Sequence, residues 1–149
     1  MVDLKSEAEL REAIELLYFA YRGFTERADR ILERRGLGRT HHRILYFVGR
    51  DPDLQVRDLL KVLAVSKQAL NAPLRQLLEM GLVAALPGAK DRRVRNLQLT
   101  GEGRRLEAEL TGAQARYLDA AFRAAGPLAE QGWRAVMADL SASAAGTRP

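Results

Sequence analysis

The spacing of the apolar residues changes at Gly81, and this change limits the folds that the chain can adopt. Before Gly81, apolar residues recur every three or four positions, as they do along one face of a helix. Segments 82–86 and 94–99 have the period of two that is typical of strands. The short basic segment 87–93 between them begins with Pro-Gly, so the two strands are predicted to form an antiparallel hairpin.

Three short helices are predicted ahead of this hairpin, over 41–50, 55–63 and 66–80. Thr40 is expected to cap the first helix, and an Asp-Pro-Asp turn ends it. Ser66 is expected to cap the third helix, which ends at a glycine. Short helices joined by a turn and followed by a β-hairpin are the elements of a winged helix-turn-helix lobe.

The predicted lobe spans 40–100, with a recognition helix at 66–80 and a wing at 82–99. A helix of this kind fits the major groove of duplex DNA, where Gln and Asn pair with adenine and Arg and Lys with guanine. The expected DNA contacts of this helix are its exposed polar residues, Ser66, Lys67, Gln68, Asn71 and Arg75.

The positive charge of the chain gathers at the wing and just beyond it. The net charge is +5, the first 33 residues are acidic on balance, and segment 90–105 carries six Lys or Arg against two acids. Lys90, Arg92 and Arg93 are therefore expected to contact phosphates or the minor groove. The polar residues of helix 66–80 or the cations of the wing would each be typical of a solvated surface if they occurred alone. Together and in this order they favour double-stranded DNA as the partner.

Long amphipathic helices are predicted on both sides of the lobe, over 6–35, 101–124 and 128–140, and the tail 141–149 is expected to be frayed. The first helix is too long to be covered by a single core, so its free apolar face predicts a homodimer. The predicted fold class is therefore mainly α with a small β-hairpin wing. The whole chain, 1–149, forms a single domain whose dimerisation region comprises 6–35 and 101–140.

Several other classes of protein find no support. The chain has no cysteine, no glycine-rich phosphate loop and no nucleophile–base pattern, so we expect neither an enzyme nor a cofactor. Neighbouring positions on a helix point about 100° apart, so His41 and His42 do not clamp one metal, and no metal site is expected. No apolar run is long enough to span a membrane, and we expect a cytoplasmic protein.

From residue 6 to about residue 140, the chain resembles the MarR family of bacterial winged-helix regulators. The resemblance is carried by the order of helices, by Ser66-Lys67-Gln68, by the Gly81-Leu82-Val83 exit, and by Asp91-Arg92-Arg93 followed by Leu99-Thr100 and Gly103.

The resemblance implies a two-fold dimer that reads a pseudo-palindromic site and acts as a repressor. Asp91 would brace one of the wing arginines. The dimer seam would draw on apolar residues of the long helices, which are Leu10, Ile14, Leu17, Leu118, Phe122, Trp133, Val136 and Met137.

The resemblance also implies a small aromatic or phenolic effector, bound between the dimerisation helices and the lobe. Residues that could line such a pocket supply aromatic faces and polar groups, and they are Tyr18, Phe19, Arg22, His42 and Tyr46. The same aromatic residues would serve equally well as ordinary core.

Pro73 departs from the expected pattern because it lies inside the recognition helix, where it removes a backbone donor and crowds the carbonyl of Ala69. The helix is expected to kink there or to sit differently in the groove. Two other functions remain open: a winged helix that docks other proteins, and an architectural DNA binder with little sequence preference.

Overall fold

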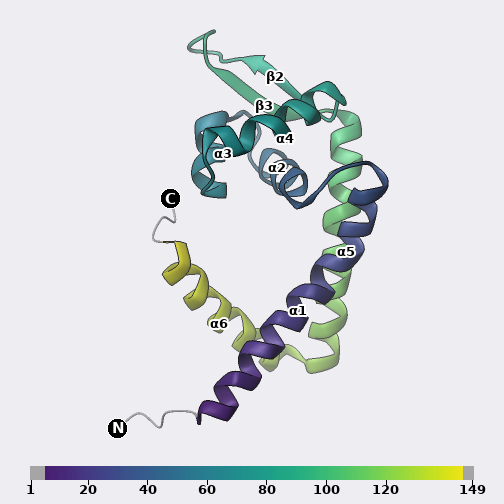
Figure 1. The fold of residues 1–149 in the computed structure, drawn as a ribbon, viewed down its shortest axis with the longest axis vertical. Coiled ribbons are helices and arrows are strands. Elements are labelled where there is room, and N and C mark those ends of the chain that lie inside the picture. Colours follow the sequence, from purple (N-terminus) through teal and green to yellow (C-terminus); the bar gives the residue numbers. More distant parts are fainter. Residues whose placement is uncertain (1–5, 146–149) are drawn as a thin grey trace.

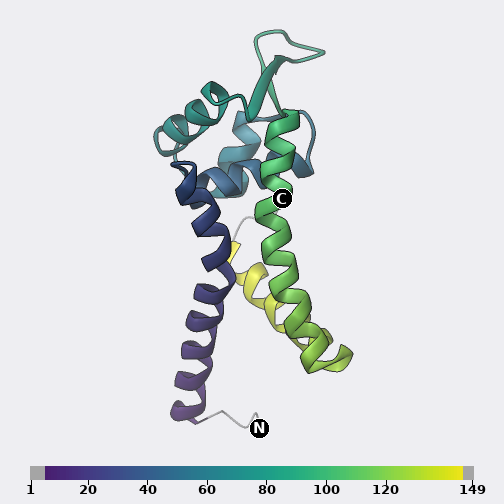
Figure 2. The ribbon, with the colours of Figure 1, turned by 90° about the vertical axis from the view of Figure 1, so that its right-hand side faces the viewer.

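The computed structural model describes residues 6–145 and shows a winged helix-turn-helix lobe carried on two long helices. The long helices, α1 and α5, both run from the lobe to the opposite end of the molecule, where they diverge (Figures 1 and 2). A sixth helix, α6, turns back from that end toward the lobe (Figure 1). The predicted fold class, mainly α with a small β wing, is confirmed.

The lobe contains three short helices, α2 (Arg39–Arg50), α3 (Val56–Leu63) and α4 (Lys67–Glu79). Each has an apolar stripe that faces a common core. The centre of this core is fully buried and includes Ile44 and Leu45 of α2, Leu59 of α3 and Leu77 of α4. Burial of these side chains holds the three helices in one orientation relative to each other.

A three-stranded antiparallel sheet of order β1-β3-β2 completes the lobe. The wing strands β2 (Val83–Pro87) and β3 (Arg95–Leu99) pair from Val83 opposite Leu99 to Pro87 opposite Arg95. The third strand, β1 (Leu54–Gln55), has two residues and was not predicted from the sequence, because two residues are too few to display a period.

The long helices begin at well-formed caps. Ser6 and Glu9 form a capping box at the start of α1 (Glu7–Arg34), and Thr100 caps α5 (Gly101–Ala125). Gly126, at φ +96°, ends α5, and Pro127 opens α6 (Pro127–Ala145).

Two of the predicted helix ends are wrong. Helix α2 begins at Arg39 with Gly38 at its N-cap, so Thr40 lies inside the helix and does not cap it. The ring of His41 accepts the Gly38 N–H instead, at 2.9 Å. The tail was expected to fray from residue 141, but α6 continues to Ala145 because the small residues there are compatible with a helix. The rest of that tail, 146–149, lies outside the described residues.

Helix α5 packs directly against the start of the wing through Gly103. A Cβ at this position would overlap the backbone carbonyl of Leu82, so only glycine permits the contact. Thr100 fixes the same junction, since its hydroxyl donates to the carbonyl of Gly81 at 2.6 Å and accepts the N–H of Gly103 at 3.0 Å. These contacts attach the start of the wing to α5.

The far halves of the long helices expose a large apolar surface. In α1 the buried residues, Thr25, Ala28 and Leu32, all belong to the half near the lobe. The other half of α1 and much of α6 leave apolar side chains uncovered, namely Leu10, Ile14, Leu16, Leu17, Tyr18, Phe19, Leu128, Trp133, Val136 and Leu140. Exposed apolar side chains in this number are typical of an interaction surface.

Candidate DNA-binding surface and adjoining cavity

Helix α4 presents one apolar face and one polar face. Leu70, Leu74 and Leu77 are buried, and the hydroxyl of Ser66 caps the helix by accepting the N–H of Ala69 at 3.1 Å. The side chains predicted to contact DNA are all exposed, and they are Ser66, Lys67, Gln68, Asn71 and Arg75. Burial of the leucines therefore directs these polar side chains away from the lobe.

Pro73 does not interrupt the helix, which is continuous from Lys67 to Glu79. The leucines on either side of it are buried, and this packing holds the helical backbone despite the missing N–H at residue 73. The third and fourth turns therefore keep Arg75 on the same helix as the N-terminal polar residues.

The wing ends in a short loop in which Lys90, Asp91, Arg92 and Arg93 are all exposed. The loop is closed by two backbone bonds, Gly88 N–H to the Val94 carbonyl at 2.8 Å and Val94 N–H to the Asp91 carbonyl at 3.1 Å. One carboxylate oxygen of Asp91 accepts both the backbone N–H and the Nε–H of Arg93, at 3.0 and 3.3 Å. Asp91 therefore restrains Arg93.

A cation outside the wing also faces this region. Arg57, near the start of α3, lines a hollow of about 370 Å³ beside the wing loop together with Lys90 and Asn96. The Oδ1 atom of Asn96 is buried without a protein partner. Arg57 was not singled out from the sequence, because it belongs to neither the recognition helix nor the wing and has Asp58 beside it.

The wing and α4 lie at the same end of the molecule, away from the N-terminal end of α1 (Figure 1). That end presents guanidinium and ammonium groups, which bind phosphates, together with amide side chains, which pair with base edges. The two predicted sets of residues are therefore brought to one surface of suitable chemistry.

A cavity of about 460 Å³ lies between the lobe and the long helices. Its walls come from α1, α2 and α5 and include both aromatic rings and polar groups. The residues that line it are Tyr21, Phe24, Thr25, Asp29, Arg39, His42, Arg43, Tyr46, Phe47, Thr111, Gln114, Ala115 and Leu118.

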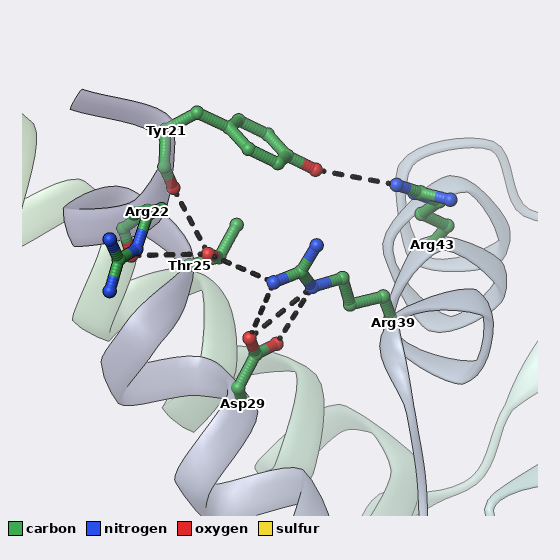
Figure 3. A network of polar contacts seen from close by, with 6 residues as sticks. All are labelled: Tyr21, Arg22, Thr25, Asp29, Arg39 and Arg43. Carbon is green, nitrogen blue, oxygen red and sulfur yellow. Dashed lines mark hydrogen bonds and ion pairs between the residues drawn. The ribbon is translucent and has the colours of Figure 1, made fainter. Parts of the chain in front are cut away.

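A polar network crosses one wall of this cavity (Figure 3). Arg39, at the start of α2, forms a bidentate pair with Asp29 of α1 at 2.8 to 3.2 Å and also donates to the hydroxyl of Thr25 at 3.3 Å. The hydrogen bond and the charge of Asp29 raise the pKa of Arg39. Arg43 donates to the hydroxyl of Tyr21 at 3.4 Å. The network joins α1 to α2 and leaves Arg43 without a carboxylate partner among the described residues.

His42 is the buried imidazole of the cavity wall, with 8% of its surface exposed. Burial lowers its pKa, and this effect exceeds the opposing influence of Glu107 and Asp29. Its Nε2 lies 3.3 Å from the hydroxyl of Thr111, which donates to Glu107 at 2.9 Å. The hydroxyl proton is thus engaged, so the neutral imidazole donates from Nε2 to the oxygen of Thr111.

The residues predicted to line an effector pocket do not all meet in one place. His42 and Tyr46 line the 460 Å³ cavity, whereas Phe19 and Arg22 line a neighbouring hollow of about 470 Å³. Tyr18 lines neither, and its ring packs edge-on against Phe19. The polar residues Asp29, Arg39 and Arg43 were missed, because contacts between α1 and α2 leave no local pattern in the sequence.

Within residues 6–145 there is neither a metal-binding cluster nor a membrane-spanning helix. No group of three or more His, Asp or Glu side chains there is placed to hold a metal ion. Over the same residues, no helix combines the length and apolarity needed to cross a membrane.

Comparison with known proteins identifies similar regulators. A sequence model of the MarR family matches residues 35–94. The chain is 48% identical over 132 residues to the HTH-type transcriptional regulator PetP of Rhodobacter capsulatus, an alignment that covers 89% of this chain and 80% of PetP.

Solved structures share the fold at low identity. The crystal structure of one MarR family transcription regulator matches with a TM-score of 0.77 at 17% identity, over 93% of this chain and 92% of the other. The crystal structure of NadR in complex with 4-hydroxyphenylacetate matches with a TM-score of 0.69 at 23% identity, over 99% of this chain and 98% of the other.

Proposed function

Because this chain belongs to the MarR family of transcriptional regulators, we propose that it represses transcription by binding a pseudo-palindromic duplex site as a homodimer. In this proposal Ser66, Lys67, Gln68, Asn71 and Arg75 contact DNA in the major groove. Lys90, Arg92 and Arg93 of the wing contact the backbone or the minor groove, while Asp91 holds Arg93 in position.

One observation carries the proposal: two separate elements, α4 and the wing, expose their cationic and amide side chains at one end of the molecule. A single polar helix face needs no binding partner to explain it, because any helix packed on a core by its apolar side exposes its polar side. A second, unconnected set of cations at the same end is what a polyanionic partner requires. Arg57 adds a further positive charge beside the wing loop.

The second copy is proposed to cover the exposed apolar faces of α1 and α6. Ile14 and Val136 are 66% and 59% exposed in the single chain, and their neighbours on the same helices are similarly uncovered. A two-fold dimer would bury these faces and set two copies of α4 in successive major grooves, about one helical turn apart.

The 460 Å³ cavity is proposed to receive a small aromatic effector that releases the protein from DNA. The aromatic side chains that line it can pack against the ring of an aromatic ligand. Arg43 offers a cation that no carboxylate of the described residues neutralises. NadR, which shares the fold, was crystallised with 4-hydroxyphenylacetate. This compound is a small aromatic anion, whose carboxylate could pair with Arg43. Isothermal titration with 4-hydroxyphenylacetate tests the idea, and Arg43→Met should weaken that binding.

The regulator can be distinguished from the two other functions by one binding assay. Fluorescence anisotropy would compare duplex DNA from upstream of the gene with a random duplex of equal length. We expect a preference of at least about 1,000-fold for the upstream site. Equal binding to both duplexes would identify an architectural protein, and no binding to either would favour a module that docks other proteins.

The wing assignment makes a prediction about salt. The double variant Arg92→Ala, Arg93→Ala should weaken binding to specific and random DNA alike. It should also reduce the slope of log K against log salt by about 1 for each lost phosphate contact. Arg123→Ala, which removes an exposed cation at the far end of α5, is the matched control and should change neither. An unchanged slope in the double variant would contradict the assignment.

A further inference from the structure

The linker between α1 and α2 is tied to the recognition helix by two side chains that the DNA surface does not use. The Nε2 of Gln76, on α4, donates to the carbonyl of Gly36 at 3.2 Å. The Oε1 of the same amide lies 2.8 Å from Nε2 of His41. The Nδ1 of His41 accepts the N–H of Gly38 at 2.9 Å. These bonds form a closed loop, here called the clasp, that starts and ends on the linker 36–38.

The direction of every bond in the clasp is determined. The Gly38 N–H must donate, so Nδ1 of His41 is unprotonated and the neutral ring carries its proton on Nε2. That proton is donated to the amide oxygen of Gln76, which leaves the amide nitrogen to donate to Gly36. All three side-chain contacts are satisfied in this one arrangement, so the clasp fixes both the His41 ring and the Gln76 amide.

Pro73 explains why α4 would depend on an external tie. It removes the N–H that would bond to the carbonyl of Ala69, so the second half of α4 is joined to the first half by one hydrogen bond fewer. Gln76 follows Pro73 by three residues and therefore lies on the same side of the helix, one turn later. The clasp holds the part of the helix that the proline weakens.

The tie leaves the DNA-facing side free. Gln76 is half-buried and lies about 100° around the helix from Arg75, which is exposed. Gln76 therefore holds α4 at the side of the helix, between its exposed polar face and its buried leucine face. The adjacent His42 makes the corresponding link on the other side of α2, to Thr111 of α5. The first turn of α2 is thus joined to the recognition helix by one imidazole and to α5 by the next.

We propose that His41 and Gln76 are positioning residues for DNA recognition: their clasp fixes α4 to the end of α1, so that the dimerisation helix sets the orientation of α4 on DNA. The proposal rests on the proposed function, because it assumes that α4 reads the site. Neither side chain contacts DNA itself. Their effect is expected in the preference for the site, not in the general affinity for phosphates.

Three variants separate the link to α4 from the cap of α2. His41→Asn keeps an acceptor near the position of Nδ1 for the Gly38 N–H but does not reach Gln76. His41→Gln places an amide N–H near the position of Nε2 and restores a donor to Gln76. Gln76→Ala removes the clasp from the other side. Thermal unfolding and sedimentation of each variant would check that the fold and the association state are retained.

The binding ratio between the upstream duplex and a random duplex is the main measurement. We expect His41→Asn and Gln76→Ala each to lower this ratio about fivefold, which is the net effect of losing about one hydrogen bond. The double variant should lose no more than either single variant, and His41→Gln should recover most of the ratio. Binding to random DNA should not change. An unchanged ratio, additive losses, or no recovery in His41→Gln would each overturn the proposal.

A measurement without DNA distinguishes this proposal from the proposed function. Amide hydrogen exchange over residues 74–79 should be faster in His41→Asn and Gln76→Ala and slow again in His41→Gln. Imidazole ¹⁵N spectra of the wild type should show His41 with its proton on Nε2. Unchanged exchange would overturn the clasp whatever the DNA results. A wild-type protein without preference for the upstream duplex would instead count against the proposed function, and with it against the DNA role of the clasp.

Discussion

A single glycine determines how closely the long helix α5 approaches the start of the wing. Gly103 lies against the backbone of Leu82, and no side-chain motion can relieve a clash with a carbonyl. Gly103→Ala should therefore lower the free energy of unfolding by about 3 kcal/mol or more. Chemical denaturation would measure the loss. Gly101→Ala, two residues earlier on the same helix and exposed, should change it by less than about 0.5 kcal/mol.

The imidazole of His42 makes stability depend on pH. Burial lowers its pKa in the folded chain below the ordinary value of 6.5, so the unfolded chain binds the proton first as the pH falls. The free energy of unfolding should therefore decline between about pH 7.5 and pH 5.5, a range in which most carboxylates stay ionised. Above this range both states are neutral at His42 and no contribution remains.

Substitution of His42 tests this origin. In His42→Gln the melting temperature should fall less between pH 7.5 and 5.5 than in the wild type, because the titrating group is gone. Equal slopes in the wild type and in His42→Gln would show that another group is responsible.

At the scale of the elements, the turn between α3 and α4 places an alanine in a backbone conformation that favours glycine. Ala64 adopts φ +53°, a left-handed conformation in which its Cβ is crowded. Ala64→Gly should raise the free energy of unfolding by about 0.5–1 kcal/mol. The same change at Ala72, an exposed position inside α4, should lower it by about 1 kcal/mol. A loss of stability in Ala64→Gly would contradict this account of the turn.

The helices could be predicted from the sequence because the period of their apolar residues is local. The errors occur where a contact replaces the local signal. His41 caps α2 from inside the helix, so Thr40 was the wrong cap, and β1 exists only because β3 lies beside it. Pro73 was expected to kink α4 or to shift it in the groove; the helix runs without a break from Lys67 to Glu79, with buried leucines on both sides of the proline.

The candidate site divides in the same way. The cations and amides of α4 and the wing are clustered in the sequence and could be found there. The pairing of Asp29 with Arg39 and that of His41 with Gln76 join positions 10 and 35 residues apart, so no spacing rule reveals them. Tyr18, Phe19 and Arg22 lie on α1 as expected, but only a three-dimensional arrangement could show that they lie outside the 460 Å³ cavity.

For the whole molecule, the proposed dimer depends on apolar faces that the single chain leaves open. Ile14→Asp places a charge in the middle of the exposed face of α1 and should weaken dimerisation at least tenfold. Sedimentation equilibrium would measure the change. Arg11→Ala, which removes only an exposed ion pair with Glu7, is the matched control. A variant Ile14→Asp that associates as the wild type does would place the seam elsewhere.

The uncovered half of α1 also has a consequence for how such a regulator responds to its own abundance. In a dimer whose subunits are stabilised by each other, melting temperature rises with protein concentration. If DNA is bound only by dimers, occupancy of the site grows with the square of the monomer concentration wherever monomers predominate. A twofold change in synthesis then gives about a fourfold change in bound complex at low occupancy. If the proposed dimer forms through the apolar face of α1, the occupancy of its DNA site would therefore depend steeply on gene dosage.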